Sequence, residues 1–260
     1  MMQAEGKSEA GMPDLIQRTA EALVETRSAV ALTGAGISIE SGIPPFRGPG
    51  GLWEKVDPME VATIDAFRRD PEKVWHLLLK GMQAFLTAAR PNDGHRGLAR
   101  LEEWGYLRSV ITQNVDGLHQ AAGSRDVIEF HGTFAWQRCL KCGSRCETPR
   151  VDLSRIPPQC SCGGIYRPDC VFFGEMIPPQ HLERSHQLVA HCDVLLVVGT
   201  SATVQPAAMM PHLAKQTGAL VVEVNPEPTP LTGQVSDYLL QGPAGEMINA
   251  IVARVETLRG

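Results

Sequence analysis

The stretch AVALTGAGISIESGIPPFRGPGG, from Ala29 to Gly51, decides the fold. It opens with the apolar run Ala29–Leu32, which is typical of a buried parallel strand. Small residues follow in Thr33-Gly34-Ala35-Gly36, and at the end of such a strand they let backbone N–H groups approach a pyrophosphate closely. The dinucleotide fingerprint has a third glycine where Ile39 stands, so a plain tight turn into a helix fits the same pattern.

Composition bounds the class of protein. The chain has 260 residues, 43% of them hydrophobic, and a formal net charge of −5. These values are typical of a globular protein of one or two domains, and the acidic balance argues against nucleic-acid binding over the whole chain. No apolar run of about 18 residues occurs, and the first residues have no apolar signal core. We therefore expect no membrane span and a cytoplasmic location.

Apolar runs that alternate with amphipathic segments predict the rest of the architecture. We expect strands over 106–112, 127–130, 194–198 and 219–224, and helices over 13–26, 58–69, 71–90, 95–104, 206–216 and 245–258. This alternation predicts an α/β fold with a Rossmann-like parallel sheet and helices on both faces. The large domain is expected to comprise 1–43, 91–135 and 171–260. Two inserts, a helical module over 44–90 and a zinc module over 136–170, are expected to form a smaller domain.

The cysteines are the strongest signal from residues alone. All seven lie between positions 139 and 192, and in a reducing compartment such clustering favours metal binding over disulfides. Cys139 and Cys142 form one close pair, and Cys160 and Cys162 form a second. Four thiolates in two pairs suit tetrahedral zinc, and a full ligand set indicates a structural ion. Cys146 is a rival ligand, whereas Cys170 and Cys192 lie in apolar contexts typical of packing residues.

Polar residues follow two of the predicted strands. Gln113, Asn114 and Asp116 come at the carboxyl end of one strand, where open α/β sheets bind their ligands. Their amides and carboxylate suit a ribose and a carboxamide, although Asn and Asp are also common helix N-caps. His131, followed by Gly132, comes at the end of another strand. A histidine there is either structural or a general base that titrates near neutrality.

Seven motifs together resemble those of one family, in its order. They are GAGISIESGIPPFRG, TQNVDGLH, His131-Gly132, the CxxC…CxC insert, RPDCVFFGE from Arg167, GTS from Gly199, and Asn225-Pro226-Glu227. On these motifs the chain resembles the bacterial and archaeal sirtuins, NAD-dependent protein deacylases, from about Thr19 to its end. The resemblance implies that NAD is consumed as a co-substrate. Nicotinamide is released, and the acyl group of an acyl-lysine protein or peptide passes to ADP-ribose.

The resemblance also implies a role for individual residues. His131 acts as general base on a ribose hydroxyl, and Asn114 is catalytic with it. Val171, Phe172, Gly174 and Glu175 pair with the substrate backbone as an added strand, with Val204 at the opposite edge. One structural zinc ion is expected. The protein is expected to be a monomer that binds neither a membrane nor nucleic acid. The residues expected to bind NAD are Gly34, Ala35, Gly36, Phe46, Arg47, Trp53, Gln113, Asn114, Asp116, Gly199, Thr200, Ser201, Asn225 and Ala244.

The chain departs from the family pattern in three ways. Pro45 stands where Asp or Thr is frequent, and its missing N–H affects closure of the cofactor loop. Cys170 stands where Val is common. Members that remove succinyl groups carry a Tyr and an Arg where this chain has Leu78 and Gly81, and neither residue here can neutralise a carboxylate. An apolar wall that includes Met82 is expected instead, which favours acetyl and longer neutral acyl groups over succinyl.

Two other functions use the same features. An ADP-ribosyltransferase would use the same NAD site but leave ADP-ribose on a protein. A zinc-ribbon nucleic-acid binder would explain the cysteines and their basic neighbours Arg138, Lys141, Arg145 and Arg150. The glycine loop and the acidic net charge argue against the nucleic-acid binder.

Overall fold

The computed structural model describes residues 11–46, 50–54 and 56–260. Its centre is a six-stranded parallel sheet in the order β3-β2-β1-β7-β8-β9. The strands are β1 (Ala29–Thr33), β2 (Leu107–Thr112), β3 (Val127–Glu129), β7 (Val194–Val198), β8 (Leu220–Asn225) and β9 (Tyr238–Gln241). Every residue of β1 and β7 is buried, which explains their continuous apolar sequences.

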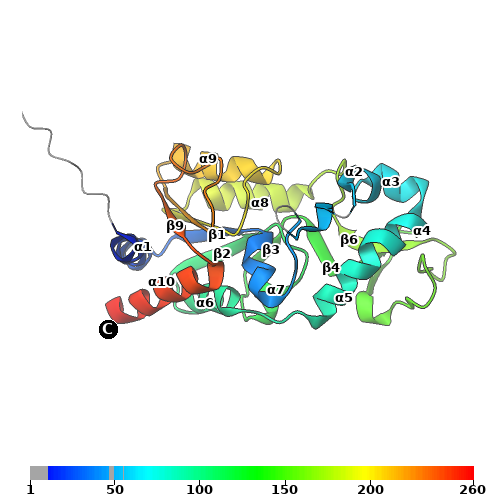
Figure 1. The fold of residues 1–260 in the computed structure, drawn as a ribbon, viewed down its shortest axis with the longest axis horizontal. Coiled ribbons are helices and arrows are strands. Elements are labelled where there is room, and N and C mark those ends of the chain that lie inside the picture. Colours follow the sequence, from blue (N-terminus) through cyan, green and yellow to red (C-terminus); the bar gives the residue numbers. More distant parts are fainter. Residues whose placement is uncertain (1–10, 47–49, 55) are drawn as a thin grey trace, which may run out of the picture.

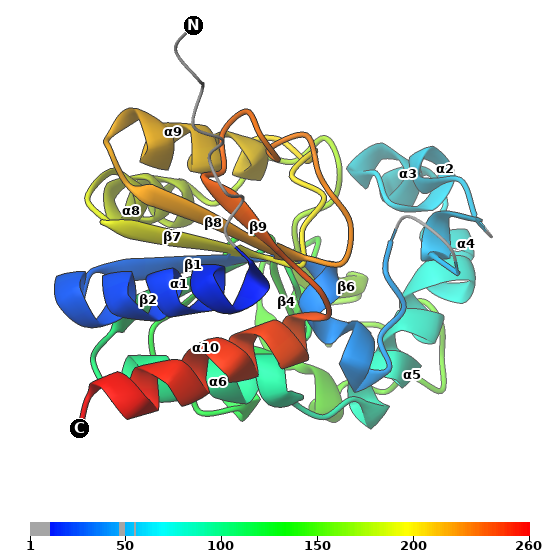
Figure 2. The same ribbon diagram turned by 60° about the vertical axis from the view of Figure 1, so that its left-hand side comes forward.

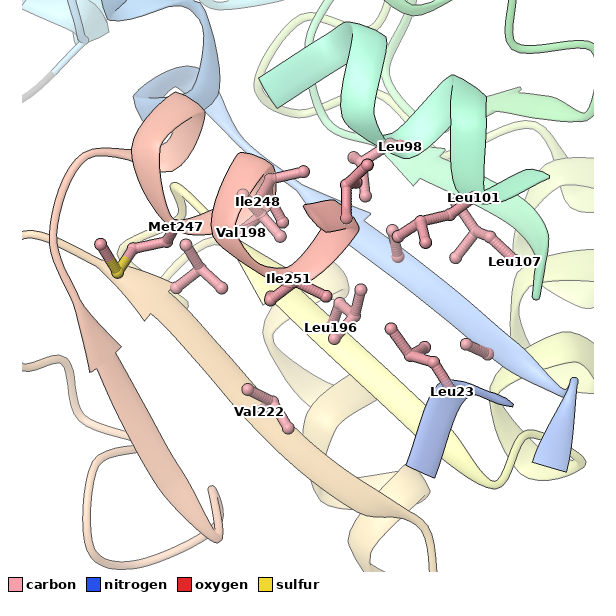
Figure 3. Close-up of a cluster of buried hydrophobic side chains, with 14 of the residues drawn as sticks. Leu23, Leu98, Leu101, Leu107, Leu196, Val198, Val222, Met247, Ile248 and Ile251 are labelled. Carbon is pink, nitrogen blue, oxygen red and sulfur yellow. The ribbon is translucent and has the colours of Figure 1, made fainter. Parts of the chain in front are cut away.

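Helices cover both faces of this sheet (Figure 2). One face packs against α1 (Met12–Thr26), α6 (Asp93–Glu103) and α10 (Ala244–Leu258), and the other against α8 (Pro179–Ala190) and α9 (Met210–Gln216). Figure 3 shows the first layer, in which Ile251 of α10 lies beside Leu196 of β7 and Leu98 of α6 lies on the side of Ile248 of α10. Leu195 belongs to the core on the other face, because successive side chains of a strand alternate. The predicted Rossmann-like fold is therefore confirmed.

The order of the strands reverses between β1 and β7. From β1 the chain runs outward through β2 to β3, then returns to β7 on the other side of β1 and continues to β8 and β9. In open α/β sheets, ligands bind outside the carboxyl ends of the strands at such a reversal. The loops that follow β1 and β7 meet there, with Gly34 N donating to Val198 O over 3.0 Å.

A smaller helical part lies beside the large sheet (Figure 1). It contains α2 (Pro58–Val61), α3 (Ile64–Arg69), α4 (Pro71–Val74), a π-helical turn η3 (Trp75–Leu79) and α5 (Lys80–Ala88). The helix predicted over 58–69 is two helices, because Thr63 caps α3 by accepting a hydrogen bond from Ala66 N over 3.1 Å. Phe67 and Trp75 are fully buried in the core of this part.

A second, antiparallel sheet follows β3. In it β4 (Gly132–Cys139) lies between β5 (Arg145–Glu147) and β6 (Tyr166–Cys170). Phe173, just after β6, joins this sheet to the helical part, since its N–H donates to Ala62 O and its carbonyl accepts from Ile64 N. The short elements are η1 (Ala35–Ser41), η2 (Leu52–Glu54), α7 (Leu118–Ala121), η4 (Thr148–Arg150) and η5 (Ala207–Met209). None of the helices in the described ranges has the length and apolarity that crossing a membrane requires.

Candidate active site and metal centre

The loop after β1 forms the floor of the site. It packs directly on the loop after β7, with Gly36 N donating to Gly199 O over 2.7 Å. A Cβ atom on Gly36 would lie 2.6 Å from Gly199 Cα, and one on Gly34 would lie 2.9 Å from Gly199 O. The sequence suggests that these glycines allow close approach to a pyrophosphate. The structure shows that their first requirement is close approach between the two loops.

Three backbone N–H groups remain open where these loops meet. Those of Ala35, Thr200 and Ser201 have no hydrogen-bond partner among residues 11–46, 50–54 and 56–260. Unpaired backbone donors at the start of a helical segment, and in the loop facing it, suit the phosphates of a dinucleotide. The two loops can therefore hold the phosphates of a dinucleotide.

The segment after η1 closes on itself through Phe46 and Trp53. Their rings stack with centroids 5.3 Å apart, and Trp53 N donates to Phe46 O over 3.0 Å. Pro45 O accepts from Leu52 N over 2.9 Å, a bond that does not involve the N–H that proline lacks. Arg47, also expected to bind NAD, lies outside the described residues.

Asn114 and Asp116 belong to one buried polar network. Asn114 Nδ2 donates to Gly34 O and to Ser38 Oγ, both over 3.0 Å, and Ser38 Oγ donates to Asp116 Oδ2 over 2.7 Å. Burial raises the pKa of Asp116, although the N–H of Leu118 and the Ser38 hydroxyl oppose that shift. The N-cap of α7 is Gly117, so Asn114 does not cap this helix, whereas Asp116 Oδ1 accepts from the N–H of its first residue, Leu118, over 2.9 Å. The network ties the residues after β2 to the glycine loop.

Gln113 connects the ends of three strands. Its Nε2 donates to Thr200 Oγ1 over 3.0 Å after β7 and to Thr33 O over 3.4 Å at the end of β1. Its backbone carbonyl lies 3.1 Å from Nδ1 of His131, after β3. Residues far apart in the sequence thus meet at the carboxyl edge of the sheet, as ligand-binding groups of such folds do.

His131 is held in one tautomer. A carbonyl oxygen only accepts, so the hydrogen bond to Gln113 O places the ring proton on Nδ1 and leaves a lone pair on Nε2. Burial lowers the pKa of His131 below its usual 6.5, although the bond to Gln113 opposes that shift. The ring is therefore neutral at pH 7 and can accept a proton at Nε2.

Two further histidines, which the sequence did not single out, lie beneath the site. His95 and His119 are fully buried, with ring centroids 4.8 Å apart. His119 Nε2 lies 2.9 Å from Thr33 Oγ1, and His95 Nδ1 lies 3.0 Å from Asn92 Oδ1. Burial lowers the pKa of His95 to about 4 and that of His119 to about 3. His119 ends the motif TQNVDGLH, and the local signal for His95 was Asn92, three residues before it, which makes a capping box with it.

Asn225 and Ala244, which are also expected to bind NAD, lie in neighbouring segments. Asn225 ends β8, and its carbonyl accepts from Gly242 N over 3.1 Å. Gly242 precedes Ala244, the buried first residue of α10. The end of β8 and the start of α10 are therefore adjacent.

The segment expected to bind the substrate backbone follows β6. Val171 N donates to His131 O over 2.8 Å, and both backbone groups of Phe172 are used within the segment. Among the described residues, the carbonyl of Val171 and both backbone groups of Gly174 have no partner. In Val204, which is expected at the opposite edge, the carbonyl accepts from Ala208 N over 2.9 Å. The open backbone groups of Val171 and Gly174 are therefore available to an extended peptide.

Four cysteines come together at the tip of the second sheet. The Sγ atoms of Cys139, Cys142, Cys160 and Cys162 all lie within 4.8 Å of one another. Sγ–Sγ separations of 3.5 and 3.8 Å match the spacing of about 3.8 Å that follows from Zn–S bonds of about 2.3 Å in a tetrahedron. The backbone N–H of Lys141 faces Cys139 Sγ over 3.4 Å, as in outer-shell contacts to metal thiolates. Cys146, on β5, is not a member of this group.

Comparisons with known proteins agree with this geometry. The sequence model of the Sir2 family matches residues 34–206. "NAD-dependent protein deacylase 2" of Pyrobaculum aerophilum is 50% identical over 238 residues, which cover 91% of this chain and 94% of that protein. A crystal structure of a Sir2 homologue–NAD complex has a TM-score of 0.87 at 43% identity, over 99% of this chain and 98% of the other.

A structure with a peptide is also similar. A Sir2–p53 peptide–NAD+ complex has a TM-score of 0.84 at 34% identity, over 95% of this chain and all of that chain (100%). The family match includes the glycine loop, His131 and the four cysteines. This chain therefore belongs to the Sir2 family, the sirtuins, which its seven motifs resemble.

Proposed function

We propose that this protein is an NAD-dependent protein-lysine deacylase that removes acetyl groups. The observation that carries the proposal is His131, a neutral ring fixed by Gln113 O at the edge of the sheet where the glycine loop also lies. The same histidine is joined through its carbonyl to Val171, the start of the proposed substrate edge. A base, a nucleotide-type loop and a free backbone edge thus lie together.

Each group has a chemical task in this proposal. Bound NAD supplies a ribose carbon that becomes electrophilic as nicotinamide departs. Asn114, Gln113 and Asp116 orient the ribose and carboxamide. Hydrogen bonds of Asn114 and Asp116 to Ser38, and of Gln113 to Thr200, fix these side chains before the ligand binds. Nε2 of His131 accepts a proton from a bound hydroxyl, which contributes about 10²–10⁴-fold in rate. Val171 O is free to accept a hydrogen bond from the substrate amide.

The four cysteines hold zinc as a structural ion. All four positions of a tetrahedron are filled by protein sulfur, so no position is left for water or substrate. We propose that the parts act as predicted, with 1–43, 91–135 and 171–260 binding NAD, and with 44–90 and 136–170 forming the smaller domain. A monomer also stays a prediction.

The basic residues beside the cysteines do not favour a nucleic-acid role. Arg138 and Arg145 both contact the carboxylate of Asp169, over 2.7 and 2.6 Å, and Arg150 contacts Glu147 over 2.9 Å. Cations already paired with carboxylates release fewer phosphate counterions. The deacylase proposal therefore stands ahead of the zinc-ribbon alternative.

The helical part supports a preference for acyl groups without charge. Leu78 packs in its apolar core, and Gly81 has open space where a side chain would start. Lys80, a candidate partner for a succinyl carboxylate, instead lines a cavity of about 410 Å³ with Trp75 and Leu153. An unpaired carboxylate in an apolar wall is strongly disfavoured.

Incubation of the protein with an acetylated peptide, with and without NAD, tests the proposed function. Loss of the acetyl group only when NAD is present is the expected result. Transfer of ADP-ribose to the peptide without loss of acetyl would instead identify an ADP-ribosyltransferase.

A further inference from the structure

The segment that follows β6 is built around a buried guanidinium. The Arg167 side chain is 7% exposed and donates to both carboxylate oxygens of Glu175, over 2.7 and 2.8 Å. It also donates to the backbone carbonyls of Pro168, over 3.1 Å, and of Cys170. One side chain therefore contacts the segment at its beginning, its middle and its end.

The same ion pair also fixes the centre of the segment. Glu175 Oε2 accepts a hydrogen bond from Phe172 N over 2.9 Å. Arg167 Cζ lies 4.5 Å from the centroid of the Phe172 ring, and that ring lies 5.5 Å from the ring of Phe67 on α3. A planar guanidinium can contact two carboxylate oxygens and stack on an aromatic ring at once, which a lysine ammonium cannot.

These contacts occupy some of the hydrogen-bonding groups of the segment and leave other backbone groups without a partner. The backbone of Phe172 and the side chain of Glu175 are bonded internally, and Phe173 is bonded to residues 62 and 64. The carbonyl of Val171 and the backbone groups of Gly174 keep no partner among the described residues. Their positions depend on where Arg167 holds the carbonyl of Cys170 and the carboxylate of Glu175.

We propose that Arg167 is a positioning residue for the acyl-lysine substrate, acting through Glu175. By fixing the segment before the peptide arrives, the pair presents Val171 and Gly174 as a preformed edge and lowers the ordering cost of binding. A buried ion pair contributes little net stability after desolvation, so its main effect here is on geometry. The inference rests on the proposed function, because it assumes that the peptide pairs with this edge.

Steady-state kinetics with one acetylated peptide tests this role. Arg167→Met and Glu175→Gln should each raise the KM for peptide about tenfold, the scale expected for a misplaced binding edge. The Kd for NAD should stay close to wild type, because neither side chain contacts the glycine loop in the described part of the chain. The KM for peptide of Arg167→Lys should lie between those of the wild type and Arg167→Met, since lysine keeps the charge but not the contact with both carboxylate oxygens.

A matched control removes a two-oxygen ion pair elsewhere. Arg184 donates to both carboxylate oxygens of Asp126, over 2.7 and 2.6 Å, at the β3 side of the large sheet. Arg184→Met should leave the KM for peptide and the Kd for NAD unchanged. If it raises the peptide KM as much as Arg167→Met does, the effect is not specific to the segment and the proposal fails.

The remaining outcomes are decisive as well. An unchanged peptide KM in both Arg167→Met and Glu175→Gln overturns the proposal, and so does an equal weakening of NAD and peptide binding. If Arg167→Met does not fold, Glu175→Gln and Arg167→Lys decide the question by the same measurements. A wild-type protein that removes no acyl group refutes the proposed function instead. Direct peptide binding by the wild type and by Glu175→Gln then decides the positioning role.

Discussion

Nδ1 of His131 lies 3.1 Å from the backbone carbonyl oxygen of Gln113. The two residues follow adjacent parallel strands, and Phe130 N donates to Thr112 O between them over 2.9 Å. The sheet therefore sets the tautomer of the histidine, because the carbonyl can only accept. Nε2 is left as the basic atom of the site.

Replacing His131 by alanine should abolish most deacylation. Loss of a general base lowers kcat by about 10²–10⁴-fold, while the fold and the Kd for NAD should be retained. His191→Ala is a matched control, since His191 Nδ1 also lies on a backbone carbonyl, 2.7 Å from Gln187 O, but on an exposed helix end. Turnover of His131→Ala within a few-fold of wild type would rule out the base assignment.

The pH dependence of the wild type checks the same assignment. Burial lowers the pKa of His131 below 6.5, so the ring keeps its basic form to lower pH than a free histidine does. The fall of kcat/KM at acid pH should therefore have its midpoint below pH 6.5. The Kd for NAD should show no such change with pH. A midpoint above pH 6.5 would contradict the neutral ring.

The cysteine cluster should bind one zinc ion that supports the fold. Cys142→Ser removes one of four ligands, so both the zinc content and the thermal stability should fall, because metal binding contributes to folding free energy. Cys146→Ser is the control and should keep its zinc, since Cys146 lies outside the cluster. Full zinc occupancy in Cys142→Ser would show that Cys146 is the fourth ligand.

The buried histidine pair should make the protein sensitive to acid. His95 and His119 have pKa values of about 4 and about 3 when folded and 6.5 when unfolded, so between these values the unfolded chain binds more protons. Their contribution to stability is complete above pH 6.5 and is lost as the pH falls toward 4 and 3. The free energy of unfolding should fall by up to about 1.4 kcal/mol per pH unit for each histidine.

Urea unfolding of the wild type and of His119→Gln over pH 5–7 measures this effect. The variant removes one titrating group, so its stability should depend less steeply on pH, while carboxylates such as Asp116 contribute equally to both proteins. Identical slopes in the two proteins would show that His119 is not neutral in the folded state.

The acyl preference can be measured with one peptide carrying acetyl, succinyl or myristoyl groups. The acetylated peptide should react with a higher kcat/KM than the succinylated peptide. Removal of succinyl should be strongly suppressed, because Leu78 and Gly81 offer no cation to its carboxylate. The double substitution Leu78→Tyr and Gly81→Arg should raise the succinyl rate, since position 81 has open space for a side chain. A wild-type succinyl rate equal to the acetyl rate would contradict the apolar wall and point to Lys80.

Much of the fold could be predicted because its signals are local. The apolar runs of β1 and β7 and the paired cysteines are complete within a few residues. The strands β4 to β6 were missed, because a short sheet held around a metal cluster needs no apolar alternation. Helix α8 was missed as well: only Ser185 and Val189 of it are buried, so its apolar face is weak.

The site was predictable as a set of residues but not as a geometry. The motifs indicated Gln113 and His131, yet not that one sets the tautomer of the other. The contact between His95 and His119 and the ion pair between Arg167 and Glu175 depend on tertiary packing. No sequence period reports such contacts.

The most direct test of the central claim is the fate of the acyl group. Nicotinamide, deacylated peptide and O-acyl-ADP-ribose should form in equal amounts when the protein is incubated with NAD and an acetylated peptide, as quantified by mass spectrometry. Free acetate formed without nicotinamide release, or ADP-ribose attached to the peptide, would contradict transfer of the acyl group to ADP-ribose.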